Sequence, residues 1–69
     1  MEIKVGQLWQ HTGYPSDLHS VCCVVQTMFI PDTGNVITYH YLDDPDYLWH
    51  KEENFFLTVY SLVNDVYKR

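Results

Sequence analysis

Three clusters of turn-forming residues divide the chain into short segments, and this division limits the folds that it can adopt. The clusters are residues 12–17, 31–35 and 43–46. Apart from Tyr14 they consist of Gly, Pro, Asn, Asp, Ser and Thr, which set or tolerate the dihedral angles of turns. The segments between them are rich in Val, Ile, Thr, Tyr and Phe, the residue types that fit a pleated, half-buried surface. The sequence therefore predicts short strands joined by turns.

The predicted strands are residues 5–11, 20–30, 35–42 and 47–51. The second of these has apolar residues on both faces, as a central strand does, and "PDTGN" after it predicts a hairpin turn with Gly34 at a positive φ. Residues 52–56, "EENFF", predict one turn of 3₁₀ or α helix with acids at its N-terminus. Residues 57–67 fit both a strand and a helix, and we favour a fifth short strand followed by a brief helical or frayed end.

Residues 1–69 form a single domain, because a chain of this length has room for one small core. Short strands at intervals of about ten residues favour a barrel or a sandwich over a parallel sheet. We predict a mainly β fold, a small SH3-like antiparallel five-stranded barrel with a short 3₁₀ or helical turn near residues 52–56. Its predicted core contains Trp9, Val24, Ile37, Trp49 and Phe55.

The order of four pieces, "VGQLWQH", "VCCVV", "VITYHYLDD" and "YLWHKEENFF", resembles a group of small bacterial and phage domains of unknown function with an SH3-like barrel. The residues that match the pattern are Gly6, Trp9, His11, Tyr39, Trp49 and Phe55. The resemblance covers most of residues 5–60. This chain departs from it by lacking the usual proline after the final Trp and by extending beyond Phe56. The resemblance implies the fold and a phage or prophage origin, and it assigns no reaction.

The net charge of −5 leaves no basic stripe for phosphate groups, and three of the four bases are Lys51, Lys68 and Arg69. This balance disfavours direct nucleic-acid binding and suits a basic protein partner. Cys22 and Cys23 are adjacent and provide no disulfide framework, which is typical of a reducing compartment. With no signal-peptide pattern and no membrane-spanning run, we expect a cytoplasmic protein, in the host cytoplasm if it is phage-encoded.

The patterns that would indicate metal or thiol chemistry are incomplete. No two histidines have a recognised zinc spacing, and the sequence leaves open whether His11, His40 and His50 converge on neighbouring strands. Residues 43–46 fit a proline-bearing turn better than a calcium loop. Strand cysteines on an apolar face are usually inert. We therefore predict no catalytic residue, no metal site and no cofactor.

The two Trp, six Tyr and three Phe residues exceed what a small core can hold, because each aromatic side chain buries roughly 150 to 250 Å². Some of the rings must then lie on the surface, where Tyr and Trp dominate binding energy. Three uses remain open. The rings can form a cage for a cationic side chain, stack on single-stranded nucleic acid, which the charge disfavours, or contact another protein.

We predict a non-enzymatic protein-interaction module, a phage or prophage accessory protein that binds and inhibits a host protein through an acidic, Tyr-rich surface. The predicted contact residues are Tyr41, Asp43, Asp44, Asp46 and Tyr47. The partner is a host protein or a second copy in a homo-oligomer. The alternative is an acidic nucleic-acid mimic that blocks a DNA- or RNA-binding enzyme, although nine acids are a low density for that. A metal-dependent or thiol enzyme ranks last.

Overall fold

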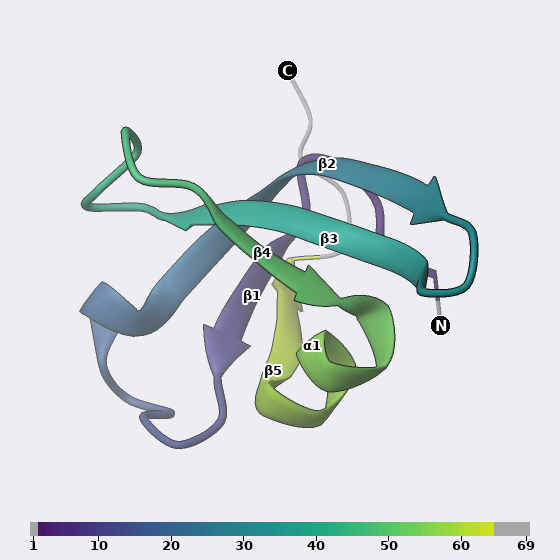
Figure 1. The fold of residues 1–69 in the computed structure, drawn as a ribbon. Coiled ribbons are helices and arrows are strands. Elements are labelled where there is room, and N and C mark those ends of the chain that lie inside the picture. Colours follow the sequence, from purple (N-terminus) through teal and green to yellow (C-terminus); the bar gives the residue numbers. More distant parts are fainter. Residues whose placement is uncertain (1, 65–69) are drawn as a thin grey trace.

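The computed structural model describes residues 2–64 and has a mainly β fold (Figure 1). The elements are β1 (Leu8–His11), η1 (Leu18–Ser20), β2 (Val21–Ile30), β3 (Gly34–Tyr41), β4 (Trp49–Glu52), α1 (Glu53–Val59) and β5 (Tyr60–Asn64). One antiparallel sheet contains the five strands in the order β4-β3-β2-β1-β5. The predicted antiparallel β fold is thus confirmed. No ladder joins β4 to β5 within residues 2–64, so the sheet is open and its closure into a barrel stays a prediction.

The turns and the end of the chain follow the predicted pattern with small shifts. Gly34 has φ +99° in the β2–β3 hairpin, as predicted, and Asp32 also adopts a positive φ of 72°. The predicted helical turn is longer than expected and continues to Val59. The expected fifth strand begins at Tyr60, and the helical or frayed end predicted beyond it lies outside the described residues. No helix within residues 2–64 has the length and apolar character needed to cross a membrane.

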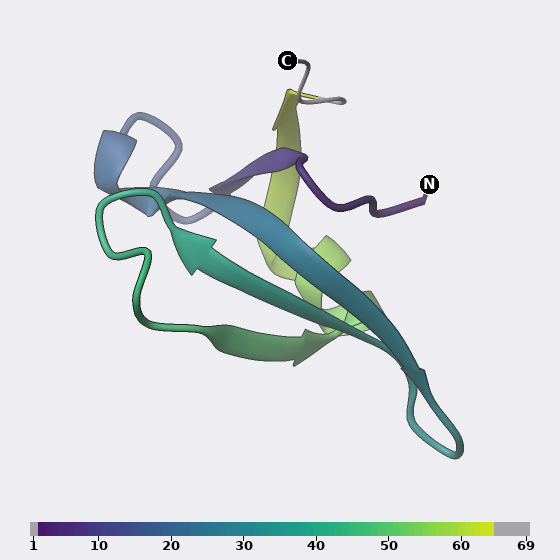
Figure 2. The same ribbon diagram turned by 90° about the horizontal axis from the view of Figure 1, so that it is seen from above.

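Strand β2 is bent by a bulge. Val24 pairs with Tyr39 and Gln26 pairs with Thr38, so Val25 is an extra residue in the ladder with β3. A bulge of this kind bends the strand and increases its twist. Before the bulge β2 also pairs with β1, and beyond it β2 and β3 form a hairpin arm that extends away from the body of the protein (Figure 2). The bend allows a single sheet to coil around its own inner face.

The inner face of the sheet carries the core, which α1 covers. The buried core residues are Ile3, Trp9, Cys22, Val24, Ile37, Tyr39, Phe56 and Tyr60. The ring of Phe56 stacks on that of Tyr60, with centroids 4.6 Å apart and planes 24° apart. The edges of Trp9 and Tyr39 meet the same Phe56 ring at 5.2 and 5.1 Å. Edge-to-face and stacked contacts of this type stabilise a core beyond the area that they bury.

The predicted core positions Trp9, Val24 and Ile37 are confirmed, since each is at most 1% exposed. The predictions for Trp49 and Phe55 are wrong, because their exposed fractions are 39% and 49%. Trp49 begins β4, which is an edge strand and has a neighbour on one side only. In α1 the position that points into the core is Phe56, one residue later than predicted, and Phe55 therefore turns away from the centre.

A buried glutamine fixes the chain before β1. Gln7 is 1% exposed, and its Oε1 accepts hydrogen bonds from the Lys4 backbone N–H at 2.8 Å and from the Trp9 Nε1–H at 3.2 Å. These bonds satisfy the indole of Trp9 inside the core, where an unpaired donor would be costly. Gln7 therefore orients the largest core side chain from the adjacent strand end.

The two adjacent phenylalanines provide a test of the core. We expect Phe56→Ala to lower the free energy of unfolding by about 3 to 5 kcal/mol, because it removes a fully buried ring and leaves a cavity. Phe55→Ala is the matched control and should cost less than about 1 kcal/mol. Urea unfolding followed by tryptophan fluorescence measures both, with Phe56→Leu as a milder variant. Equal losses at the two positions would contradict the assigned core.

Candidate functional site

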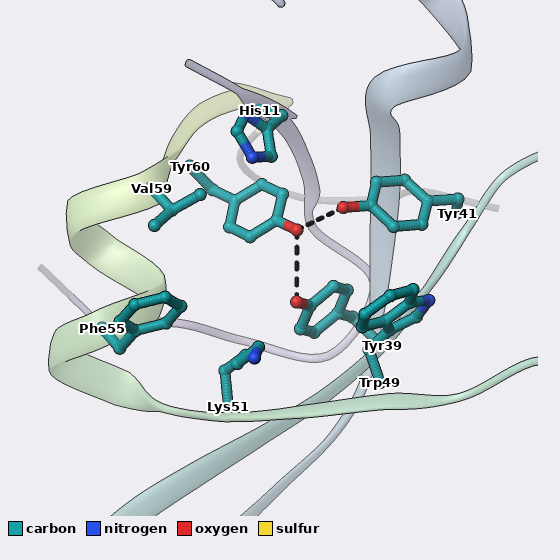
Figure 3. A pocket seen from close by; sticks show the side chains of 8 residues that line it. All are labelled: His11, Tyr39, Tyr41, Trp49, Lys51, Phe55, Val59 and Tyr60. Atoms are coloured by element: carbon teal, nitrogen blue, oxygen red, sulfur yellow. Dashed lines mark hydrogen bonds between the residues drawn. The ribbon is translucent and has the colours of Figure 1, made fainter. Parts of the chain in front are cut away.

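A pocket of about 390 Å³ opens beside the core, and we call it the aromatic pocket (Figure 3). It is lined by His11, Tyr39, Tyr41, Trp49, Lys51, Phe55, Val59 and Tyr60. These residues come from β1, β3, β4, α1 and β5, so the pocket exists only when the whole sheet and its helix have assembled. Its volume lies in the range of pockets that hold a small molecule or one large side chain.

Strand register explains which side chains reach the pocket. In the β3–β4 ladder Ile37 pairs with Lys51 and Tyr39 pairs with Trp49. Directly paired residues share a face, and residues two apart in a strand do so too. Lys51 and Trp49 therefore lie on the inner face with the buried Ile37 and Tyr39. On α1, Phe55 and Val59 are four residues apart and share one side of the helix, which closes the pocket from the opposite direction.

Three tyrosine hydroxyls meet in the wall of the aromatic pocket. The Tyr60 hydroxyl donates to the Tyr39 oxygen at 3.2 Å, and a second, short hydrogen bond joins the hydroxyls of Tyr60 and Tyr41 (Figure 3). Three hydroxyls bring three protons, and two bonds among them use two. One proton is left over, and neither of these two hydrogen bonds uses it.

The hydroxyls of Tyr39 and Tyr60 remain protonated at neutral pH. Burial raises the pKa of Tyr39 to about 12. Burial raises the pKa of Tyr60 even further, and its hydrogen bonds with Tyr39 and Tyr41 act in the same direction. Tyr39 and Tyr60 therefore act as neutral hydroxyl groups in the pocket wall and not as phenolates.

Lys51 places a positive charge in the pocket. Its Nζ lies 5.1 Å from the centroid of the Phe55 ring, in a cation–π contact. No acid lines the pocket, and within residues 2–64 no carboxylate forms an ion pair with Lys51. The cage for a cationic side chain considered from the sequence is disfavoured, because an ammonium of the protein itself already occupies the aromatic wall.

His11 adds a further donor to the lining. Its Nδ1 accepts a hydrogen bond from the Gly13 backbone N–H at 3.0 Å, so the neutral imidazole carries its proton on Nε2. The ring meets the Tyr60 ring edge-on, with centroids 5.2 Å apart. His11 is the last residue of β1, and its ring packs against Tyr60 at the start of β5. These two connections fix the imidazole at the pocket wall.

Four of the five predicted contact residues lie in the exposed β3–β4 loop, residues 42–48, and Tyr41 lines the pocket. Two consecutive turns form the loop. The Asp44 N–H donates to the Tyr41 carbonyl at 3.0 Å, and the Tyr47 N–H donates to the Asp44 carbonyl at 3.3 Å. Pro45 occupies the second position of the later turn, where its fixed φ is suited. The proline-bearing turn predicted for residues 43–46 is confirmed.

A line of aromatic rings connects this loop to the pocket. The Tyr47 ring contacts Trp49 with centroids 5.2 Å apart, and Trp49 contacts Tyr41 at 5.9 Å. Both contacts are edge-to-face. We call Tyr41, Trp49 and Tyr47 the aromatic ladder. The structure therefore joins two of the predicted contact residues, Tyr41 and Tyr47, through a tryptophan that the sequence had assigned to the core.

The three aspartates of the loop have different surroundings. Asp43 Oδ2 lies 2.6 Å from Nδ1 of His19, which is in η1, and the two side chains are exposed. This hydrogen bond and the charge of Asp43 raise the pKa of His19. Asp44 and Asp46 are exposed in the loop. The ion pair joins the loop to the segment before β2 and leaves the other two carboxylates to solvent.

The cysteines and histidines among residues 2–64 take part in no group of three or more metal-ligating side chains, and both cysteines are free. Burial raises the pKa of the Cys22 thiol to about 12 and also raises that of Cys23, so both are protonated at neutral pH. His50 bonds Thr38 at 2.9 Å on the outer face of the sheet, whereas His11 lies in the pocket on the inner face. His11, His40 and His50 therefore do not converge.

Comparison of the chain with protein-family models, curated proteins and solved structures finds no match. The resemblance to small bacterial and phage domains thus stays a prediction. The role of the aromatic pocket is therefore inferred from the geometry of the pocket.

The buried tyrosines predict how stability depends on pH. Their folded pKa values lie above the unfolded value of 10, so their contribution to stability is complete below pH 10 and is lost as the pH rises toward 12. We expect Tyr60→Phe to make the alkaline loss of unfolding free energy shallower. The control Tyr14→Phe, at a 60% exposed position, should leave the profile unchanged. Urea midpoints measured from about pH 9 upward test this, and identical profiles for the two variants would contradict it.

The His19–Asp43 pair predicts a local titration. Because the folded pKa of His19 is raised above its ordinary value of 6.5, the pair is complete below that pH and is lost as the pH rises through the raised pKa. In Asp43→Asn the pKa of His19 should fall toward 6.5. NMR titration of the His19 ring protons measures this in the unaltered protein and in the variant. An unaltered His19 titration would show that the two side chains do not meet in solution.

Proposed function

We propose that this protein is a non-enzymatic protein-interaction module whose docking surface combines the aromatic pocket, the aromatic ladder and the acidic β3–β4 loop. The observation that supports this proposal is the aromatic ladder. It runs without a break from a half-buried tyrosine at the pocket to a tyrosine that is 56% exposed. Rigid exposed rings supply contact area at a low cost in conformational entropy, which is why they dominate protein interfaces.

The charges beside the ladder support a partner with a basic surface. Asp44 and Asp46 are exposed and lie in the same loop as Tyr47. Charges at the rim of an interface mainly steer the approach of the partner and set its orientation, while the aromatic centre supplies the affinity. This division of roles fits a surface with rings at its centre and carboxylates on one side.

The finer parts of the proposal concern architecture and origin. The bent β2 and the position of α1 between the two edge strands support an SH3-like barrel as the architecture. The resemblance in Gly6, Trp9, His11 and Trp49 supports a phage or prophage accessory protein. Such a protein would bind and inhibit a host protein in the host cytoplasm.

Substitution of two loop residues tests the docking surface. We expect Tyr47→Ala with Asp44→Ala to leave the thermal midpoint nearly unchanged, because both side chains are exposed, and to abolish partner capture. The readout is a pull-down from a bacterial lysate with mass spectrometry, followed by binding of the purified partner. A partner retained by the double variant would contradict the proposed surface.

The hairpin arm offers a matched control. Phe29 is 70% exposed, and Asp32 lies in the turn at the tip. Phe29→Ala with Asp32→Asn removes one exposed ring and one acid, as the test variant does, and asparagine tolerates the positive φ at residue 32. This control should capture the partner as the unaltered protein does. The salt dependence of the complex separates a ring-centred interface from nucleic-acid mimicry, whose complex would dissociate steeply as salt is added.

A further inference from the structure

We propose that the aromatic pocket binds a carboxylate group, and that Lys51 is the residue that recognises it. The chemistry of the pocket carries this inference. The source of the carboxylate, an Asp or Glu side chain of the protein partner, rests on the proposed function.

The first observation is the position of Lys51. The pairing of β4 with β3 puts the Lys51 side chain on the inner face of the sheet, beside its cross-strand partner, the buried Ile37. Lys51 itself is only partly exposed. The chain has nine acids and four bases, yet within residues 2–64 no acid forms an ion pair with this lysine. An ammonium in a partly covered site that has no counter-ion among residues 2–64 is stabilised by an anion that enters the site.

The second observation is the excess of donors in the lining. The two hydrogen bonds among the three tyrosine hydroxyls leave one proton unused, and neutral His11 carries its proton on Nε2. Together with the ammonium of Lys51 they give the pocket three kinds of donor, and no carboxylate lines it. An ionised carboxylate has two oxygens that accept several hydrogen bonds, and charge-assisted bonds are the strong ones.

The third observation is the apolar wall. Trp49, Phe55 and Val59 line the pocket between the donors, so there is room for the hydrocarbon stem that carries the carboxylate. The pocket should therefore favour a carboxylate on an apolar stem over a free inorganic anion. It should reject an ammonium on the same stem, because Lys51 repels it.

The acidic loop refines the partner's chemistry. Asp44 and Asp46 lie outside the pocket, on the loop that follows its Tyr41 wall. A partner that places one acid in the pocket meets these carboxylates next to it. We therefore infer a partner surface on which an Asp or Glu side chain is flanked by Lys or Arg.

Three probes of one shape test the pocket without a partner. They are 3-phenylpropionate, 3-phenylpropanamide and phenethylammonium, which present a carboxylate, a neutral amide and a cation on similar stems. Two-dimensional ¹H–¹⁵N NMR titration follows the amides of Lys51, Phe55 and His11 and the indole N–H of Trp49. We expect the carboxylate to bind roughly tenfold more tightly than the amide, as one charge-assisted bond predicts. Phenethylammonium should not shift these signals.

Substitutions of lysine assign the preference to one residue. Lys51→Met keeps an apolar stem against Phe55 and removes the charge, so it should lose the preference for carboxylate over amide. Lys51→Arg should retain the preference. Lys4→Met is the matched control, since Lys4 is exposed and does not line the pocket, and it should bind all three probes as the unaltered protein does.

Several results would overturn the proposal. Tighter binding of phenethylammonium than of the carboxylate would make the pocket a cation site. A preference that persists in Lys51→Met would remove the lysine from recognition. Self-association of Lys51→Met with an unchanged preference would mean that this inward-facing charge protects the β4 edge from pairing.

The probe titration and the partner capture fail independently. A normal probe preference combined with capture that the Tyr47→Ala and Asp44→Ala variant retains would reject the docking surface alone. Loss of capture in that variant without any probe preference would reject the carboxylate site alone.

Discussion

The stacking of Phe56 on Tyr60 is the contact on which the rest of the structure depends. A single sheet leaves its inner face open, and in this protein a helix of seven residues must cover it. The Phe56–Tyr60 pair joins the middle of that helix to β5 and packs against Trp9 of β1 and Tyr39 of β3. The same tyrosine presents its hydroxyl to the aromatic pocket. Core and pocket thus share one side chain, and the pocket shape is set by the packing that stabilises the fold.

Local signals in the sequence were sufficient for the strands and turns, and they were insufficient for burial at the sheet edge. Glycine, proline and aspartate mark the turns because their effect on the backbone is local. Trp49 and Phe55 are large aromatic residues of the type found in cores. Only the strand order shows that Trp49 lies on an edge strand, and only the packing of α1 shows that Phe56, and not Phe55, points inward. Lys51 was missed for the same reason. The alternation of side chains along β4 puts Lys51 on the same face of the sheet as Trp49. Whether that face is the inner or the outer one depends on the pairing of β4 with β3.

Opposite charges are separated within a small surface. The pocket lining holds a lysine, a histidine and tyrosine hydroxyls and no acid, whereas the neighbouring loop holds three aspartates, one of which is paired with His19. This separation exists because β4 is an edge strand whose inner face is only partly covered, so that a lysine there keeps access to water. A partner would have to place a negative charge at the pocket and a positive charge at the loop. This double requirement makes recognition selective.

The bulge at Val25 also separates the part of β2 that contributes the core residues Cys22 and Val24 from a part whose residues are all exposed. From Gln26 to Asn35 nearly every residue is exposed, and the two strands are held to each other by their cross-strand ladder. Adding or deleting two residues in each strand near the tip of this arm would preserve the inward and outward alternation of all other positions. The arm is therefore a place where evolution or an engineer can change the length of the protein, or graft a short peptide, without disturbing the interior.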